Sequence, residues 1–215
     1  MTPNKSLLTS IKNSKNTADL TSRLGEVALD QLLNQGVLRE IPVIGTAITL
    51  WQSGNDIGAY FFAKKIVAFL AEVESVPQEK RKEFIEKNCE TEGDIEHVGE
   101  ATLMLLEKMD STILAIFLGR VFRLMLTETI SRSTFDHYAH IVKNLSTYLI
   151  RQLKCFYQQE DILEIQHPAA IELSGYGLVD IGILPSRIGN TADMERQYRR
   201  TEFGSFFYEQ VIKDV

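Results

Sequence analysis

The sequence predicts a mainly α protein, in which a multi-helix bundle precedes a small winged-helix-like α+β module. Apolar residues recur at spacings of three and four from residue 18 to about residue 160, which is typical of amphipathic helices. From residue 161 onward the pattern changes to short apolar runs separated by Gly and Pro. The 215 residues are 44% hydrophobic and 24% charged, which is the composition of a globular chain with a sizeable core.

The N-terminal segment, residues 1–17, carries Lys5, Lys12 and Lys15 among Asn, Ser and Thr and has no acidic residue. We expect it to form a flexible basic arm or a frayed helix start. The bundle is then predicted over residues 18–160, beginning with a helix that Gly36 ends.

An apolar hairpin is predicted at residues 41–70. Two apolar blocks, 41–51 and 57–63, flank a Gln-Ser-Gly-Asn-Asp turn, and each block is too short to span a bilayer. The second helix of this hairpin has an apolar face, with Glu72 on the side that faces water.

The first block of the hairpin contains Ile44, Ile48 and Trp51. These side chains fit core packing, and they also fit contact with a partner protein or a membrane surface, where Trp51 would be the interfacial anchor. Both interpretations stay open on the sequence alone.

The rest of the bundle is defined by cap signals and one apolar helix. The segment from Ser111 to Ile130 is apolar nearly all round, apart from Arg120 and Arg123, which predicts a helix at the centre of the bundle. Ser133 and Asp136 have the spacing of a capping box, which predicts one long helix to about Gln158.

The C-terminal module, residues 161–215, is expected to pack on the bundle. A short helix from Pro168 leads to Gly175 and Gly177, two strands then flank the polar loop IGNTADMER, and Thr201 starts a closing helix. This order of elements is that of a winged-helix-like module.

Five arginines are candidate anion or phosphate contacts. Arg120 and Arg123 must find a carboxylate such as Glu100, Glu107 or Glu128, reach solvent, or bind a phosphate group, because an unpaired buried charge is costly. Arg196, Arg199 and Arg200 cluster on the predicted second strand. Residues 136–215 nevertheless hold more acidic than basic side chains, and the whole chain has a net charge of −6, which disfavours nucleic acid as a partner.

No signature of a known catalytic or nucleotide-binding site is present. Asp136, His137 and His140 could hold a metal ion, but a polar helix face is the simpler interpretation. Cys89 and Cys155 are too few for a disulfide scaffold. We therefore expect a non-enzymatic protein without cofactor or metal. It is expected to be cytoplasmic, with peripheral association with the inner membrane left open.

Two strings, IPVIGT at residues 41–46 and YRRTEFGSFFYE at residues 198–209, together with the layout of residues 38–215, resemble the abortive-infection alpha proteins of bacteria. The resemblance implies a bacterial antiviral-defence protein that acts through protein contacts or self-association, and it supplies no catalytic residues. Two alternatives stay open. One is a winged-helix DNA-binding transcriptional regulator, and the other is a membrane-permeabilising effector that uses the 41–70 hairpin.

Overall fold

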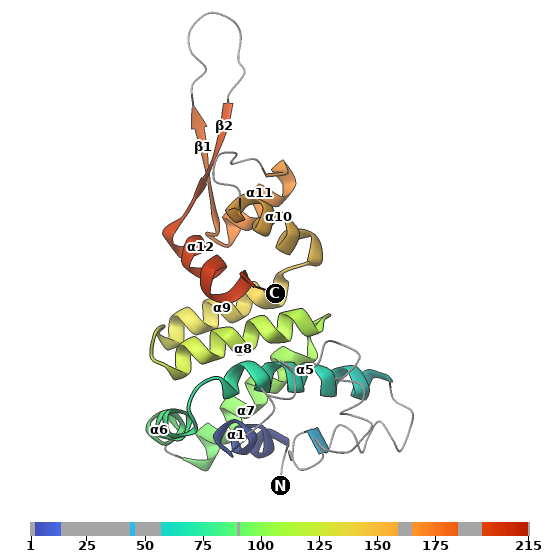
Figure 1. Cartoon of the computed structure of the whole chain (residues 1–215), viewed down its shortest axis with the longest axis vertical. Helices are drawn as coiled ribbons and strands as arrows, with labels where there is room; N and C mark the ends of the chain where they lie inside the picture. Colours follow the sequence, from blue (N-terminus) through green and yellow to red (C-terminus); the bar gives the residue numbers. More distant parts are fainter. Residues whose placement is uncertain are drawn as a thin grey trace, which may run out of the picture. The chain divides into compact units, whose positions relative to one another are not determined.

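The computed structural model describes residues 3–13, 44–45, 57–89, 91–158, 165–184 and 195–214. This part of the chain is mainly helical and has a two-stranded antiparallel sheet near the C-terminus (Figure 1), which confirms the predicted fold class. The chain divides into two compact units, Met1–Lys143 and Asn144–Val215, and each has a core of its own.

The first unit is a helical bundle, and α8 lies at its centre. Most side chains of α8 are buried, including Phe117, Phe122 and Val121, so the helix predicted to be central is central. The described helices of this unit are α1 (Pro3–Asn13), α5 (Ile57–Glu74), α6 (Gln78–Asn88), α7 (Glu92–Glu107), α8 (Thr112–Leu126) and α9 (Arg132–Asn144).

Helices α5 and α8 approach each other closely at Gly119. A Cβ atom on Gly119 would lie 2.7 Å from Glu72 Cβ and 2.8 Å from the backbone oxygen of Phe69. On either side of this contact, the Phe122 ring meets Phe69 edge-to-face at 5.4 Å and Phe135 of α9 at 5.7 Å. Such edge-to-face pairs add to the free energy gained from burial. Three helices are thus joined through one row of aromatic rings.

The predicted flexible arm at residues 1–17 is wrong where the structure describes it, because residues 3–13 form α1. Leu7 and Ile11 are fully buried, and α1 packs against α6 and α7. The buried Arg81 of α6 donates from Nη1 to the backbone oxygen of Ile11 at 2.6 Å. That bond satisfies a carbonyl in the last turn of α1, where a cation is also favoured by the helix dipole. Leu7, Leu8 and Ile11, which are all buried, and the hydrogen bond from Arg81 therefore hold a segment whose composition is otherwise polar.

The prediction of one long helix from Ser133 to Gln158 is also wrong, because the chain forms two helices there. The first, α9, begins at Arg132, and Ser131 rather than Ser133 accepts a hydrogen bond from a backbone N–H of its first turn. The second, α10 (Thr147–Gln158), is capped by Ser146, whose Oγ accepts from the backbone N–H of Leu149 at 3.2 Å. A serine hydroxyl competes with the helical backbone for such bonds, which favours a break at this point.

The boundary between the two units follows from this break. It falls between Lys143 and Asn144, earlier than the boundary predicted near residue 160. Because α10 packs against α11 and η2, it belongs to the second unit rather than to the bundle.

Two helix starts of this unit differ in their caps. Thr91 and Asp94 form the capping box of α7, in which Asp94 is the third residue of the helix. Helix α6 begins at Gln78 after Pro77 without a side-chain cap, and the Ser75 hydroxyl donates to the backbone oxygen of Glu72 at the end of α5.

The second unit is a small α+β module. Its strands pair antiparallel in the register Val179↔Arg200 to Leu184↔Glu195, which confirms the predicted hairpin, although the first strand begins earlier than expected. The unit contains α10, α11 (His167–Gly175), β1 (Val179–Leu184), β2 (Glu195–Arg200), α12 (Glu202–Phe207) and the one-turn π-helix η2 (Tyr208–Ile212).

The TEFG string that begins at Thr201 has a packing role. The Thr201 hydroxyl accepts from the backbone N–H of Gly204 at 2.8 Å and donates to the backbone oxygen of Gly177 at 2.7 Å. Gly204 lies so close to the Tyr157 hydroxyl and to the backbone oxygen of Leu178 that a Cβ has no room there. The segment that carries part of the family resemblance therefore closes the core of this module.

Several predicted features lie outside the described residues. They are the helix that Gly36 was expected to end, the hairpin turn at 52–56 and the polar loop between the strands.

The close contact at Gly119 predicts a large effect of one methyl group. Gly119→Ala is expected to lower the free energy of unfolding by about 1–3 kcal/mol, because the added carbon meets backbone and Cβ atoms that cannot move independently. Gly93→Ala in α7 is the matched control, since its Cβ would meet only Thr91 Oγ1 at 3.6 Å. We expect this control to leave stability unchanged or slightly raised. Urea denaturation of both variants measures the difference, and equal midpoints would contradict the close contact.

Candidate functional site

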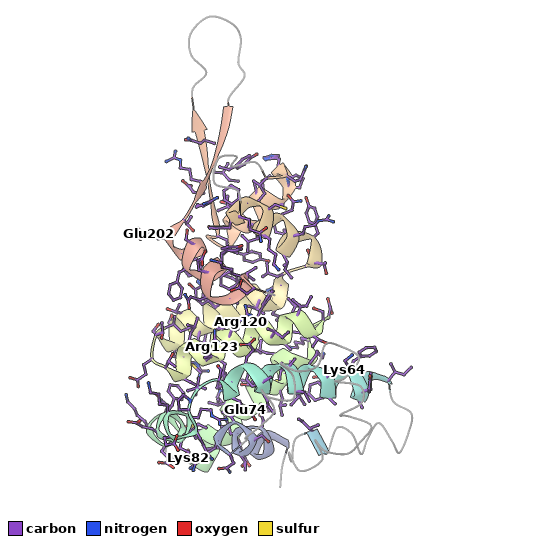
Figure 2. All side chains as sticks on the ribbon, viewed as in Figure 1. Lys64, Glu74, Lys82, Arg120, Arg123 and Glu202 are labelled. Carbon is purple, nitrogen blue, oxygen red and sulfur yellow. The ribbon has the colours of Figure 1, made fainter. Side chains whose placement is uncertain are left out.

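The two arginines of α8 lie against α5 (Figure 2) and share one carboxylate. Arg120 Nε is 3.2 Å from Glu72 Oε1, and Arg123 Nη1 is 3.4 Å from Glu72 Oε2. The Arg120 side chain is 13% exposed, that of Arg123 32% and that of Glu72 20%. The sequence analysis placed Glu72 on the side that faces water, and the structure places it against α8 instead. The close approach at Gly119 brings Glu72 beside both guanidinium groups. Both arginines therefore have a carboxylate partner within the first unit.

Arg199 and Arg200 of β2 lie on opposite faces of the sheet, because successive side chains of a strand point to opposite faces. Arg199 lies opposite Asp180, with 4.0 Å between Nε and Oδ2, whereas Arg200 donates from Nη2 to the backbone oxygen of Phe156 at 3.1 Å. Arg196 is paired in register with Ile183, and its side chain lies outside the described part. The two adjacent arginines therefore do not present their charges on the same face.

The apolar hairpin is described only in part. Ile44 is fully buried, while Ile48 and Trp51 lie outside the described residues. The beginning of α5 exposes Ile57 to 67% and Phe61 to 55%, one helical turn apart. No described helix is both long enough and apolar enough to cross a membrane.

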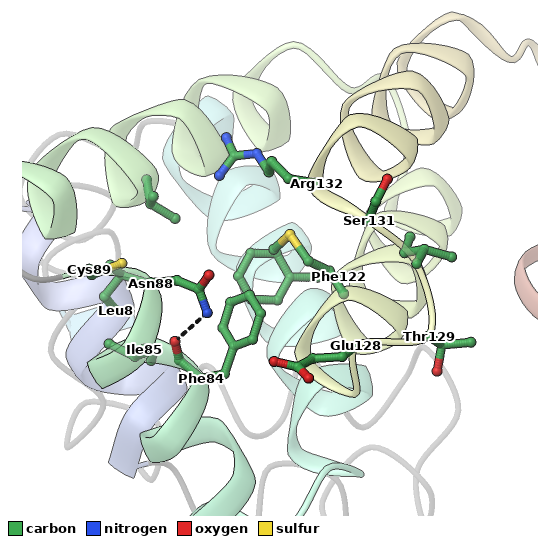
Figure 3. A pocket seen from close by; sticks show the side chains of 13 residues that line it. Leu8, Phe84, Ile85, Asn88, Cys89, Phe122, Glu128, Thr129, Ser131 and Arg132 are labelled. Atoms are coloured by element: carbon green, nitrogen blue, oxygen red, sulfur yellow. Dashed lines mark hydrogen bonds between the residues drawn. The ribbon is translucent and has the colours of Figure 1, made fainter.

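The first unit also contains a cavity of about 540 Å³ between α6, α7, α8 and the turn that joins α8 to α9 (Figure 3). Its volume lies in the range of about 300–1,000 Å³ that is usual for small-molecule sites. Its floor is apolar and is formed by Leu8, Ile85, Val98, Phe122, Met125 and Ile130. Its mouth is polar and includes Asn88, Glu128, Thr129, Ser131 and Arg132.

The mouth is shaped by an unusual end to α8. The backbone N–H of Thr129 donates to the oxygen of Leu124 at 2.9 Å, and that of Glu128 donates to the oxygen of Met125 at 3.0 Å. These two bonds are those of a Schellman motif, in which the left-handed residue is usually Gly. Here Glu128 occupies that position with φ 54°. Its carboxylate accepts a hydrogen bond from Lys87 Nζ of α6 at 2.6 Å and so links the turn after α8 to α6.

The opposite side of the mouth is formed by Arg132, the first residue of α9. Figure 3 shows Arg132 and Glu128 on opposite sides of the opening, with the Phe122 ring between them. The guanidinium lies 5.6 Å from the centre of the Phe135 ring, and its Nε donates to Asp136 Oδ1 at 3.1 Å. These two contacts fix the plane of the guanidinium group at the mouth.

Cys89 lines the cavity and is buried. Burial, and secondly the charge of Asp94, raises the pKa of its thiol, while Arg132 acts in the opposite direction. The thiol is therefore neutral at physiological pH. A catalytic cysteine needs the opposite, a thiol whose pKa is lowered.

Within the described ranges, no three His, Cys, Asp or Glu side chains gather as a metal site would require. The cavity is lined by residues of α1, α6, α7, α8, the turn after α8 and the start of α9, and the sequence analysis did not find it. The sequence feature that could have indicated the mouth of the cavity is the TETIS stretch at 127–131. There a strongly apolar helix ends without the glycine that usually follows the end of a helix.

A comparison of the chain with protein-family models, with curated proteins and with solved structures finds no match.

The left-handed backbone of Glu128 predicts an unusual order of stabilities. Glu128→Gly is expected to be more stable than Glu128→Ala by about 1 kcal/mol, because only glycine adopts this conformation without steric cost. Both variants lose the Lys87 ion pair, so that contact cancels in the comparison. At Glu83, an exposed position within α6, the order should reverse, since alanine is the better helix former. Chemical denaturation of the four variants gives the answer, and alanine as the more stable residue at both positions would refute the motif.

The raised pKa of Cys89 predicts selective alkylation. At neutral pH, iodoacetamide should modify the exposed Cys155 much faster than the buried Cys89, because only the thiolate reacts and Cys89 forms less of it. The rate at Cys89 should continue to rise with pH beyond the range of an ordinary thiol. Mass spectrometry of the two cysteine peptides between pH 7 and pH 10 measures both rates, and equal rates at pH 7 would contradict the burial.

Proposed function

We propose that this chain is a non-enzymatic phage-defence protein of the abortive-infection type, an effector or regulator that acts through protein contacts. The resemblance in residues 38–215 supports the defence role. The exposed pair Ile57 and Phe61 on α5 carries the contact role, since apolar side chains of this size on one helix face are typical of interaction sites.

Two observations support a role without catalysis. The buried Cys89 thiol has a raised pKa, and the TEFG string from Thr201 to Gly204 serves in packing. The proposed defence role therefore assigns no catalytic step to Cys89 or to the TEFG string.

The two alternatives differ in their support. Lys64 lies one turn after Tyr60 on α5 and 5.6 Å from its ring centre, so a cation accompanies the exposed apolar residues, as at a membrane surface. Duplex DNA binding has less support, since Arg199 and Arg200 contact different parts of the second unit. The inner membrane is thus kept as a second candidate location for the contact.

A phage challenge tests the proposal. Cells that express the chain should show lower plating efficiency for at least one phage of a broad panel than cells that carry the empty vector. The double variant Ile57→Ser/Phe61→Ser is expected to restore plating, because it removes the exposed apolar pair without touching the core.

The matched control is Ile171→Ser, which changes a side chain of α11 that is also 55% exposed. It should keep the protection, provided that immunoblots show equal amounts of each protein. Unchanged plating of every phage with the wild-type chain would overturn the defence role. Protection that survives the double variant would overturn the role of α5. Fractionation of the same cells shows whether the contact is at the membrane.

A further inference from the structure

We propose that the cavity between α6, α7 and α8 binds a small molecule with an apolar body and one carboxylate end, and that the carboxylate lies on Arg132. This inference is independent of the proposed defence role, because it concerns a different surface from Ile57 and Phe61.

The apolar body is inferred from the floor of the cavity. Side chains of four elements meet there, including Leu8 of α1, Ile85 of α6 and Phe122 of α8. The cavity of about 540 Å³ has room for a molecule of drug size, and a molecule that lies on these side chains loses part of its contact with water. An apolar chain gains free energy from that transfer, whereas a polar one would find few hydrogen-bond partners on the floor.

The carboxylate end is inferred from the geometry of Arg132. The edge of the guanidinium that carries Nε is already paired with a carboxylate, since Nε donates to Asp136 Oδ1 at 3.1 Å. Among the described residues, its terminal amino groups make no hydrogen bond, and the guanidinium lies at the mouth (Figure 3). Two parallel N–H donors match the two oxygens of a carboxylate, so a guanidinium can hold one carboxylate on each edge.

The charges around the mouth permit an anion to enter. Glu128 is the acidic side chain on the opposite side, and Lys87 Nζ lies 2.6 Å from its carboxylate, which offsets the repulsion. The thiol of Cys89 is neutral, so it adds no negative charge to the cavity wall. The remaining groups of the mouth are the neutral amide of Asn88 and the hydroxyls of Thr129 and Ser131, which can accept or donate hydrogen bonds.

Protection of Cys89 from alkylation tests the site in the intact protein. Decanoate, kept below its micelle-forming concentration, should slow the alkylation of Cys89 and leave Cys155 unchanged, because only Cys89 lines the cavity. Decanol, which has the same apolar body and no charge, should protect more weakly. Decyltrimethylammonium should protect least, since its cation would face Arg132.

Two variants separate the end group from the body. Arg132→Gln should weaken decanoate binding about tenfold and leave decanol binding unchanged, because only decanoate loses a hydrogen bond between two charged groups. Arg151→Gln makes the same change of charge at an exposed residue of α10 and should bind both probes as the wild type does. Val98→Phe fills the floor and should weaken both probes together. Isothermal titration gives the affinities, and circular dichroism confirms that each variant is folded.

Three results would overturn the inference. The first is that decanoate fails to protect Cys89 at any concentration below its micelle-forming limit. The second is that decanol or the ammonium probe binds as tightly as decanoate, which would remove the carboxylate preference. The third is an equal loss of decanoate affinity in Arg132→Gln and Arg151→Gln, which would show an effect of net charge rather than of the site. A loss confined to Arg132→Gln and Val98→Phe supports it, whatever the outcome of the phage challenge.

Discussion

The contact of α5 with α8 at Gly119 is the constraint on which the first unit depends. With no side chain at this position, the Phe69 backbone comes within van der Waals reach of α8, and the rotation of both helices about their axes is then fixed. Three consequences follow. Phe69 meets Phe122, Phe122 in turn meets Phe135, and Glu72 lies beside Arg120. The largely buried Arg120 side chain is stabilised there by a carboxylate partner that the same contact holds in place.

The same rotation of α8 gives the cavity its floor. Phe122 packs edge-to-face with Phe69 and also lines the cavity, so core packing and cavity shape are coupled through a single side chain. The mouth of the cavity, by contrast, does not depend on core packing. It depends on the backbone of Glu128, on the ion pair with Lys87 and on the first turn of α9. The cavity thus has a rigid apolar base and a mouth made of exposed polar groups.

Much of the fold was predictable because it depends on local patterns. The central position of α8 follows from an apolar surface on all sides, and the hairpin of the second unit follows from two short runs around a polar loop. The failures involve partners far apart in sequence or a choice between near-equal alternatives. The burial of α1 depends on Arg81, about seventy residues away, and the break before Ser146 competes with a continuous helix. The sequence analysis placed Glu72 on the side that faces water because hydrophobic periodicity alone does not determine how a helix is rotated against its neighbour.

The Schellman motif at Glu128 also separates two kinds of sequence change. Floor residues such as Phe122 belong to the core, so evolution can alter them only with compensating changes nearby. Glu128 and Thr129 are exposed, and the motif that positions them is made by backbone atoms. Their side chains can drift while the cavity persists. Descendants of this chain could therefore acquire new ligand preferences by exchanging a few solvent-facing residues, without having to rebuild the bundle beneath them.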